Sequence, residues 1–279
     1  MGRTQPVGAV KELSRIAEEA AMAAGSVLRE AFGERGLVDR ITPHDVKLAV
    51  DRVCEEEVLR VLMSECPNHA VLSEEMGYEP GSEPYLWIVD PLDGTVNFHH
   101  GIPFFCSSVA CYAIGGDGDA PVRCLLEDGR PLGAPISGAV YDPLRSELFA
   151  AAAGGGASLN RRPLRPLESA RLEDSIVSMS FGAADESIAY ASRALPRLAR
   201  FARKVRSFGS TALESVDVAA GRTGAFVQMG TNLWDFAGAA VIALEVGATF
   251  DCREIVPGRF RIIACAPGLI DEILRHTES

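Results

Sequence analysis

The chain has 279 residues, of which 47% are hydrophobic and 23% are charged, and its formal net charge is −11. This balance is typical of a folded globular protein and argues against a disordered chain. The negative charge argues against a broad nucleic-acid surface, which needs an excess of Lys and Arg, but it allows a phosphate substrate where divalent cations invert the local field.

Signals for membranes, secretion and zinc are absent from the sequence. No apolar run approaches the ~18 residues of a spanning helix, and the N-terminus lacks the basic and apolar regions of a secretory signal. The seven Cys residues form no CxxC pair, so we expect buried, reduced thiols and no zinc site. A cytoplasmic protein without membrane contact is the expectation.

The first half of the chain predicts helices followed by a meandering sheet. Apolar residues with helical spacing predict helices at residues 7–32 and about 46–64. Short apolar runs predict strands at residues 70–73, 86–90, 106–114, 136–141 and 147–152. Residues 115–135 are expected to form a loop or a hairpin, and the glycines at 154–156 a tight turn, because no phosphate-loop Lys follows them.

The second half alternates between strands and helices. Strands are predicted at residues 176–180, 204–207, 225–228, 248–251 and 262–264, and helices at 185–202, 210–220, 235–246 and from 267. Alternation of this kind indicates a layered α/β half after an α+β half. We therefore expect a single domain, 1–279, with lobes at about 1–153 and 154–279.

The strongest chemical signal is the acidic turn Asp90-Pro91-Leu92-Asp93-Gly94-Thr95. A buried strand ends on Asp90, Pro91 keeps that residue extended, and Gly94 permits a tight turn from which Thr95 caps a helix. Two carboxylates thus converge beside backbone N–H groups, an arrangement that suits Mg²⁺ and a phosphate. The alternative is a plain Asx turn in which both Asp residues bond their own backbone.

Two further acidic positions bear on this choice. Glu74 also ends a short apolar strand, although an exposed acidic turn would look the same. Asp235 lies at the start of a helix, where an ordinary N-cap is the alternative. His99 and His100 follow the acidic turn and are expected to be exposed loop residues rather than nucleophiles.

Together these motifs resemble the inositol monophosphatase family over nearly the whole chain. The resemblance is carried by Glu74-Glu75, DPLDGT at 90–95 with Asn97-Phe98, VYDP at 140–143, ELF at 147–149, Asn160, GSTA at 209–212 and WDFAGA at 234–239. It implies a layered αβαβα sandwich of the sugar phosphatase type, a homodimer, and a small phosphorylated substrate. It also implies two or three Mg²⁺ ions per active site, with Mn²⁺ as an alternative, and inhibition by Li⁺.

The resemblance also implies roles for individual residues. Glu74, Asp90 and the Leu92 carbonyl would hold one metal ion, Asp90, Asp93 and Asp235 would hold a second, and Glu74 with Asp45 through water would help to place a third. Thr95, hydrogen-bonded to Asp45, would orient the attacking water, so Thr95, Asp45 and Glu74 are the expected catalytic residues. The expected substrate-binding residues are Gly94, Thr95, Ser210, Thr211, Gln228, Asp235 and Lys47.

Three departures from the family pattern leave the substrate open. The pattern Asp-x-Val-Thr-x-x-Asp is present from Asp45 to Asp51 with Leu48 in place of Thr and with Lys47 added, Gln228 stands where a Glu is frequent, and residues 115–135 are longer than usual. Lys47 would contact phosphate or lie on a solvated helix face. Fructose 1,6-bisphosphate and a 3′(2′),5′-bisphosphate nucleotide remain alternative substrates, and a regulatory binding protein is an alternative of another class.

Overall fold

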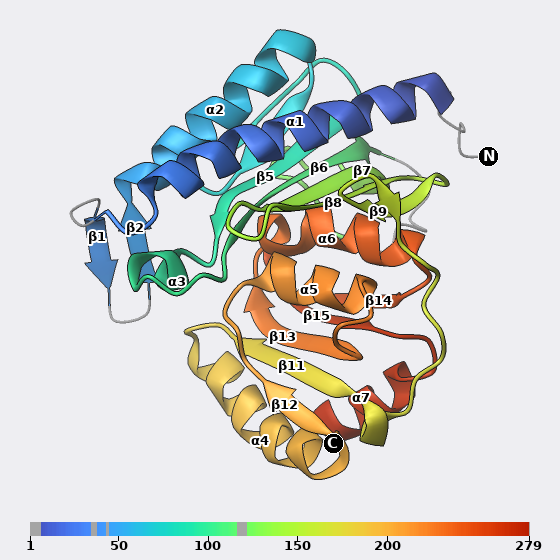
Figure 1. The fold of residues 1–279 in the computed structure, drawn as a ribbon. Coiled ribbons are helices and arrows are strands. Elements are labelled where there is room, and N and C mark those ends of the chain that lie inside the picture. The colour runs from blue at the N-terminus through green and yellow to red at the C-terminus, as the bar shows by residue number, and fades with distance from the viewer. Residues whose placement is uncertain (1–6, 35–37, 43–44, 116–121, 279) are drawn as a thin grey trace.

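The computed structural model describes residues 7–34, 38–42, 45–115 and 122–278. These residues form five layers, in the order helices, sheet, helices, sheet, helices (Figure 1). The αβαβα sandwich expected from the sequence is therefore confirmed.

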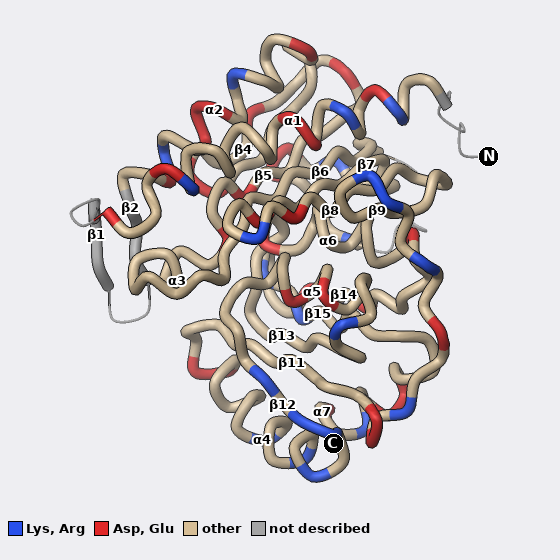
Figure 2. The backbone as a smooth tube through the Cα atoms, viewed as in Figure 1, with Lys and Arg blue, Asp and Glu red and all other residues tan. Residues whose placement is uncertain are grey.

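The first layer consists of α1 (Val7–Ala31) and α2 (Ala49–Glu65), which pack on each other and on the first sheet. The residues that recur with helical spacing along α1 are buried, among them Leu13, Ala20 and Leu28. Acidic and basic positions share the outer surface of this layer (Figure 2). Since α2 holds five acidic residues against two Arg, that helix carries no basic patch.

The first sheet has eight strands in the order β10-β9-β8-β7-β6-β5-β3-β4. Their bounds are β3 (Ala70–Ser73), β4 (Gly77–Glu79), β5 (Tyr85–Asp93), β6 (Cys106–Ile114), β7 (Leu132–Asp142), β8 (Glu147–Ala152), β9 (Gly156–Leu159) and β10 (Arg162–Pro163). Among the described strands of this sheet, only β3 and β5 pair in parallel, so their carboxyl ends lie at the same edge. A separate ribbon of β1 (Val38–Thr42) and β2 (Asp45–Leu48) contacts the short helix α3 (Thr95–His99).

The second sheet has five strands in the order β12-β11-β13-β15-β14. Its elements are η1 (Leu172–Asp174), β11 (Ile176–Phe181), β12 (Lys204–Arg206), β13 (Ala225–Thr231), β14 (Thr249–Val256) and β15 (Arg259–Cys265), with α4 (Asp185–Phe201) and α7 (Ile270–Thr277) forming the outer layer. The described helices include none that combines the length and apolarity that crossing a membrane requires.

The central layer consists of α5 (Thr211–Ala219) and α6 (Leu233–Glu245), which lie between the sheets (Figure 1). One core cluster joins Ile88 of the first sheet to Phe226 of the second through Phe236 of α6. The approach of α6 to β7 depends on two glycines, because a Cβ on Gly138 would lie 2.4 Å from the carbonyl oxygen of Gly238.

We predict that Gly138→Ala lowers the free energy of unfolding by about 1 to 3 kcal/mol, because the added methyl group must push α6 away from β7. Denaturant unfolding measures the change. Gly8→Ala in α1 is the matched control, since its Cβ would meet nothing within 4 Å. A Gly138→Ala midpoint equal to that of the unsubstituted protein would contradict the prediction.

The structure corrects some expected elements. Residues 45–48 form β2 rather than the start of a helix, since Val46 and Leu48 alternate with Asp45 and Lys47 and pair with β1. The short strands β1, β4, β9 and β10 were not predicted, and β7 begins inside the expected excursion 115–135. The expected boundary between the lobes, at residues 153 and 154, falls inside the first sheet, which continues through β10. The division into two lobes remains a prediction.

The glycine turn matches expectation, and the cysteines match it in part. Residues 153–155 form the turn between β8 and β9, and Gly154 and Gly156 donate their N–H groups to the Glu245 carboxylate, each at 2.8 Å. All seven cysteines are free thiols. Four of them are buried and three are partly exposed, so burial is less complete than the sequence predicted.

Candidate active site

Four carboxylates predicted as metal ligands come from three separate elements. Glu74 directly follows β3, Asp90 and Asp93 lie near the end of β5, and Asp235 lies in the first turn of α6. Parallel pairing of β3 with β5 places Glu74 and Asp90 at the same edge of the sheet, and α6 packs against β5. The structure thus brings these four residues to one region.

Asp90 is the most deeply buried of the four, with 1% of its surface exposed. Burial raises its pKa well above the usual value, and the negative charges of Glu74, Asp93, Asp235 and Asp51 raise it further. Its Oδ1 accepts a hydrogen bond from the Leu92 N–H at 3.1 Å. Asp90 therefore makes the Asx turn that was the alternative to a metal site. However, the charges of four other acidic residues also act on it.

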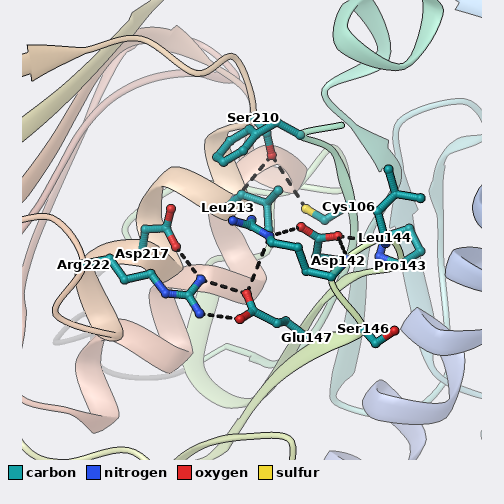
Figure 3. A network of polar contacts seen from close by, with 12 residues as sticks. Cys106, Asp142, Pro143, Leu144, Ser146, Glu147, Ser210, Leu213, Asp217 and Arg222 are labelled. Atoms are coloured by element: carbon teal, nitrogen blue, oxygen red, sulfur yellow. Dashed lines mark hydrogen bonds and ion pairs between the residues drawn. The ribbon is translucent and has the colours of Figure 1, made fainter. Parts of the chain in front are cut away.

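Asp93 is held by the start of α5, which lies more than a hundred residues later in the chain. Its Oδ2 accepts hydrogen bonds from the Ser210 hydroxyl and, at 2.7 Å, from the Ala212 N–H, and its Oδ1 accepts from the Thr211 N–H at 3.1 Å. The Cys106 thiol lies 3.7 Å from Oδ2, and Figure 3 shows it beside Ser210. Burial raises the pKa of Asp93 to about 7, although these donors act in the opposite direction.

Asp235 is the third residue of α6 rather than its N-cap. Asn232 is the N-cap, and the two residues form a capping box in which Asp235 Oδ2 accepts from the Asn232 N–H at 2.8 Å. The Thr231 hydroxyl donates to the same oxygen at 2.7 Å. Burial raises the pKa of Asp235. The capping hydrogen bonds hold its carboxyl group in place at the start of α6.

Thr95 does not cap α3 with its side chain, contrary to expectation. The N-cap is Gly94, which has a φ of 93° and whose Cβ, if present, would lie 3.0 Å from the Phe104 carbonyl oxygen. The Thr95 hydroxyl instead donates to the Leu92 carbonyl at 2.9 Å. This contact places Thr95 against the one main-chain oxygen predicted as a metal ligand.

The side chains of Asp45 and Lys47 lie outside the described residues, so their expected roles remain predictions. Asp51, six residues further on, was not assigned a role from the sequence. It is buried in the first turn of α2, and its charge contributes to the raised pKa of Asp90. The sequence does not reveal the burial of Asp51, because within a helical pattern a buried acidic residue cannot be told from one on a solvated helix face.

Three of the expected substrate-binding residues are covered, whereas Gly94, Thr95 and Asp235 are partly exposed. Ser210, Thr211 and Gln228 are all buried, and the Thr211 hydroxyl donates to Gln228 Oε1 at 2.7 Å. Ser210 is directed to Asp93. His99 and His100 are exposed, as the sequence predicted.

The far end of α5 is fixed by ion pairs to the turn between β7 and β8 (Figure 3). Arg222 bonds Asp217 at 2.9 Å and Glu147 at 2.5 Å. Arg145 bonds the buried Asp142 at 2.6 Å and lies 3.6 Å from Glu147. The helix whose first residues bind Asp93 is therefore anchored to the first sheet at its other end as well.

The chemistry of these residues fits a hard divalent cation. Carboxylate and carbonyl oxygens are the ligands that Mg²⁺ prefers. Burial, and after it the negative charge of neighbouring acids, raises the pKa of Asp90 and Asp93, and a cation would offset that charge. Within the described part of the chain, no three acidic, His or Cys side chains are yet gathered closely enough to coordinate one ion.

Comparison with known proteins points in one direction. The model of the inositol monophosphatase family matches residues 9–119 and 124–278. An inositol-1-monophosphatase of Synechocystis sp. is 34% identical over 257 residues, covering 89% of this chain and 83% of that protein. The Nus factor SuhB of Pseudomonas aeruginosa is 34% identical over 247 residues, covering 85% and 84%. The crystal structure of the extragenic suppressor protein SuhB from Bartonella henselae aligns with a TM-score of 0.81 at 29% identity, over 95% of this chain and 98% of that chain.

Proposed function

The chain belongs to the inositol monophosphatase family and is a phosphoric monoester hydrolase, and from this premise we propose that it hydrolyses an inositol monophosphate-like ester with Mg²⁺ as its cofactor. The observation that carries the proposal is the group of Glu74, Asp93 and Asp235 around the buried Asp90, each close enough to raise its pKa. Such a cluster is unfavourable without a cation.

In this proposal Glu74, Asp90, Asp93, Asp235 and the Leu92 carbonyl hold the Mg²⁺ ions. Bound Mg²⁺ supplies Lewis-acid chemistry, offsetting charge on phosphoryl oxygens and activating water. The backbone amides of Gly94 and Thr95 receive the phosphate. The Thr95 hydroxyl, which donates to the Leu92 carbonyl in this structure, would orient the attacking water together with Asp45.

The specificity beyond the phosphate group depends on Gln228 and Lys47. Gln228 replaces a frequent Glu and bonds Thr211 through its Oε1, so it offers substrate hydroxyls no negative charge. Fructose 1,6-bisphosphate and a 3′(2′),5′-bisphosphate nucleotide are therefore the alternatives to test. The homodimer and the inhibition by Li⁺ remain expectations, which light scattering and a Li⁺ titration check.

We predict that, in a substrate panel with Mg²⁺, inositol 1-phosphate is turned over with a higher kcat/KM than either bisphosphate. Phosphate release measures the rates, and reactions with EDTA in place of Mg²⁺ are the control. If inositol 1-phosphate is inert while a bisphosphate turns over, the substrate assignment fails but the phosphatase assignment stands. Equal turnover with EDTA would overturn the proposed cofactor.

A second candidate function is suggested by the relatives named Nus factor SuhB. The net charge of −11 disfavours broad nucleic-acid binding, so this role would be a protein contact within the transcription machinery, in addition to catalysis. Co-elution of the purified chain with the host's RNA polymerase and Nus proteins tests it. A chain that elutes alone in every combination would reject this candidate.

A further inference from the structure

A buried glutamate on α5 has no role in the proposed chemistry. Glu214 is 0% exposed, and its Oε1 accepts hydrogen bonds from the Ser180 hydroxyl at 2.8 Å, the Gly209 N–H at 2.9 Å and the Phe208 N–H at 3.3 Å. A buried carboxylate is costly unless its hydrogen bonds compensate. Here the bonds from Phe208 and Gly209 join the helix to the loop that precedes it, and the bond from Ser180 joins it to β11.

The same loop is held from its opposite side by Asn97. The Asn97 Nδ2 donates to the Phe208 carbonyl at 2.7 Å and to the Phe104 carbonyl at 2.8 Å. Gly209 has a φ of 86°, and a Cβ there would lie 3.1 Å from the Asn97 side chain. Residues 208 and 209 are thus bonded through their N–H groups by Glu214, while Asn97 bonds the Phe208 carbonyl.

The residues that directly follow this loop hold Asp93. Ser210, Thr211 and Ala212 donate the three hydrogen bonds that orient its carboxylate. A shift of the loop would move these donors together, because Gly209 is bonded to Ser210 by a single peptide unit. The orientation of Asp93, a proposed metal ligand on β5, therefore depends on the contacts that Glu214 makes with this loop.

From these contacts we propose that Glu214 is a positioning residue, which holds the 208–209 loop so that α5 presents Asp93 in the orientation that Mg²⁺ binding requires. The proposal rests on the proposed function for the identity of the cation. Glu214 is not among the residues proposed to hold Mg²⁺ or substrate, and its Oε1 bonds Ser180, Phe208 and Gly209. Residues that orient metal ligands typically change metal affinity or activity by about 10- to 100-fold when replaced.

The test is a graded series at position 214. Glu214→Met keeps the length of the side chain but removes the acceptor, and we expect the Mg²⁺ half-saturation concentration to rise about 10- to 100-fold. Glu214→Gln keeps a neutral acceptor, which is weaker than a charged one, and we expect a rise of roughly 2- to 5-fold. At saturating Mg²⁺ the substrate KM should stay within about 2-fold of that of the unsubstituted enzyme, since no substrate contact is removed.

The matched control is Asp217→Leu on the same helix. Asp217 is also a buried carboxylate, but it bonds Arg222 at the far end of α5 (Figure 3), and within the described part of the chain its carboxylate makes no hydrogen bond to the 208–209 loop. Asp217→Leu should lower the melting temperature without changing the Mg²⁺ half-saturation concentration. An equal loss of Mg²⁺ affinity in Asp217→Leu and Glu214→Met would reduce the effect to general destabilisation and overturn the proposal.

Calorimetric titration with Mg²⁺ alone gives a readout that is independent of turnover. Mg²⁺ binding that is weakest in Glu214→Met, intermediate in Glu214→Gln and strongest in the unsubstituted enzyme supports the positioning role. Unchanged Mg²⁺ binding in Glu214→Met overturns it. Should Glu214→Met fail to fold, unchanged binding in Glu214→Gln overturns it instead. If the unsubstituted enzyme turns over no phosphate ester with Mg²⁺, the proposed function fails, whereas the calorimetric series still decides the role of Glu214.

Discussion

Replacing Asp93 by Asn should lower kcat/KM at least about 100-fold while the fold survives. The substitution removes one of the negative charges around Asp90, and an Asn side chain offers a cation one neutral oxygen in place of a carboxylate. Steady-state phosphate release at saturating Mg²⁺ measures the loss. Turnover at the level of the unsubstituted enzyme would end the assignment of Asp93 as a metal ligand.

The stability of this variant is a balance of two opposing effects. Loss of the charge relieves repulsion with Asp90 and Asp235. However, an amide nitrogen accepts no hydrogen bond, so in one orientation of the amide the Ser210 and Ala212 donors lose their acceptor, and in the other the Thr211 N–H does. Leaving a buried donor without its acceptor costs about 1 to 3 kcal/mol. Because these terms oppose each other, a folded variant with a modest change in melting temperature is the expected outcome.

Asp174→Asn provides the matched control for charge removal. Asp174 is an exposed acid that bonds Arg203 at 2.7 Å in the outer layer, and an exposed ion pair contributes at most about 1 kcal/mol. Its activity should equal that of the unsubstituted enzyme. A loss comparable to that of Asp93→Asn would point to net charge rather than to the site.

The layers and the acidic turn could be predicted because they depend on local patterns. Helical spacing identified α1, and the buried run before Asp90 identified β5. Short strands such as β4 and β10 could not be predicted, since two or three residues carry no periodicity and pair only because a neighbouring strand is present. The same reason explains β2, where pairing with β1 replaced the expected start of α2.

The partners of the site residues were harder to predict than the residues themselves. Asp93 was singled out from its motif, but its donors lie on α5, and a single sequence carries no signal that joins positions so far apart. Ser210 and Thr211 were assigned to substrate, whereas Ser210 and the Thr211 N–H bond Asp93. The sequence offered one indication of Glu214, because it is an acidic residue between Leu213 and Val216 on a helix that is buried throughout.

Addition of Mg²⁺ should raise the melting temperature, and the rise should be larger at about pH 8 than at about pH 5.5. At a Mg²⁺ concentration 100 times its dissociation constant, binding adds about 2.7 kcal/mol, which corresponds to roughly 5 to 10 °C for a chain of this size. Thermal unfolding in Mg²⁺ and in EDTA at both pH values measures the difference.

The direction of the pH effect follows from the raised pKa of Asp93. In the unfolded chain an Asp loses its proton near pH 3.9, whereas in the cation-free fold Asp93 keeps it up to a pKa of about 7. The folded state thus binds more protons between these values, so this group's contribution to stability is full below about pH 4 and is lost as the pH rises through 7. Above that pH the Asp93 carboxylate is charged and close to Asp90 and Asp235, which is the condition in which Mg²⁺ stabilises most. The control is Asp93→Asn, whose amide cannot titrate, so Mg²⁺ should raise its melting temperature less and with less dependence on pH. If Mg²⁺ raises the melting temperature of the unsubstituted enzyme more at about pH 5.5 than at about pH 8, the carboxylate cluster is rejected as the binding site.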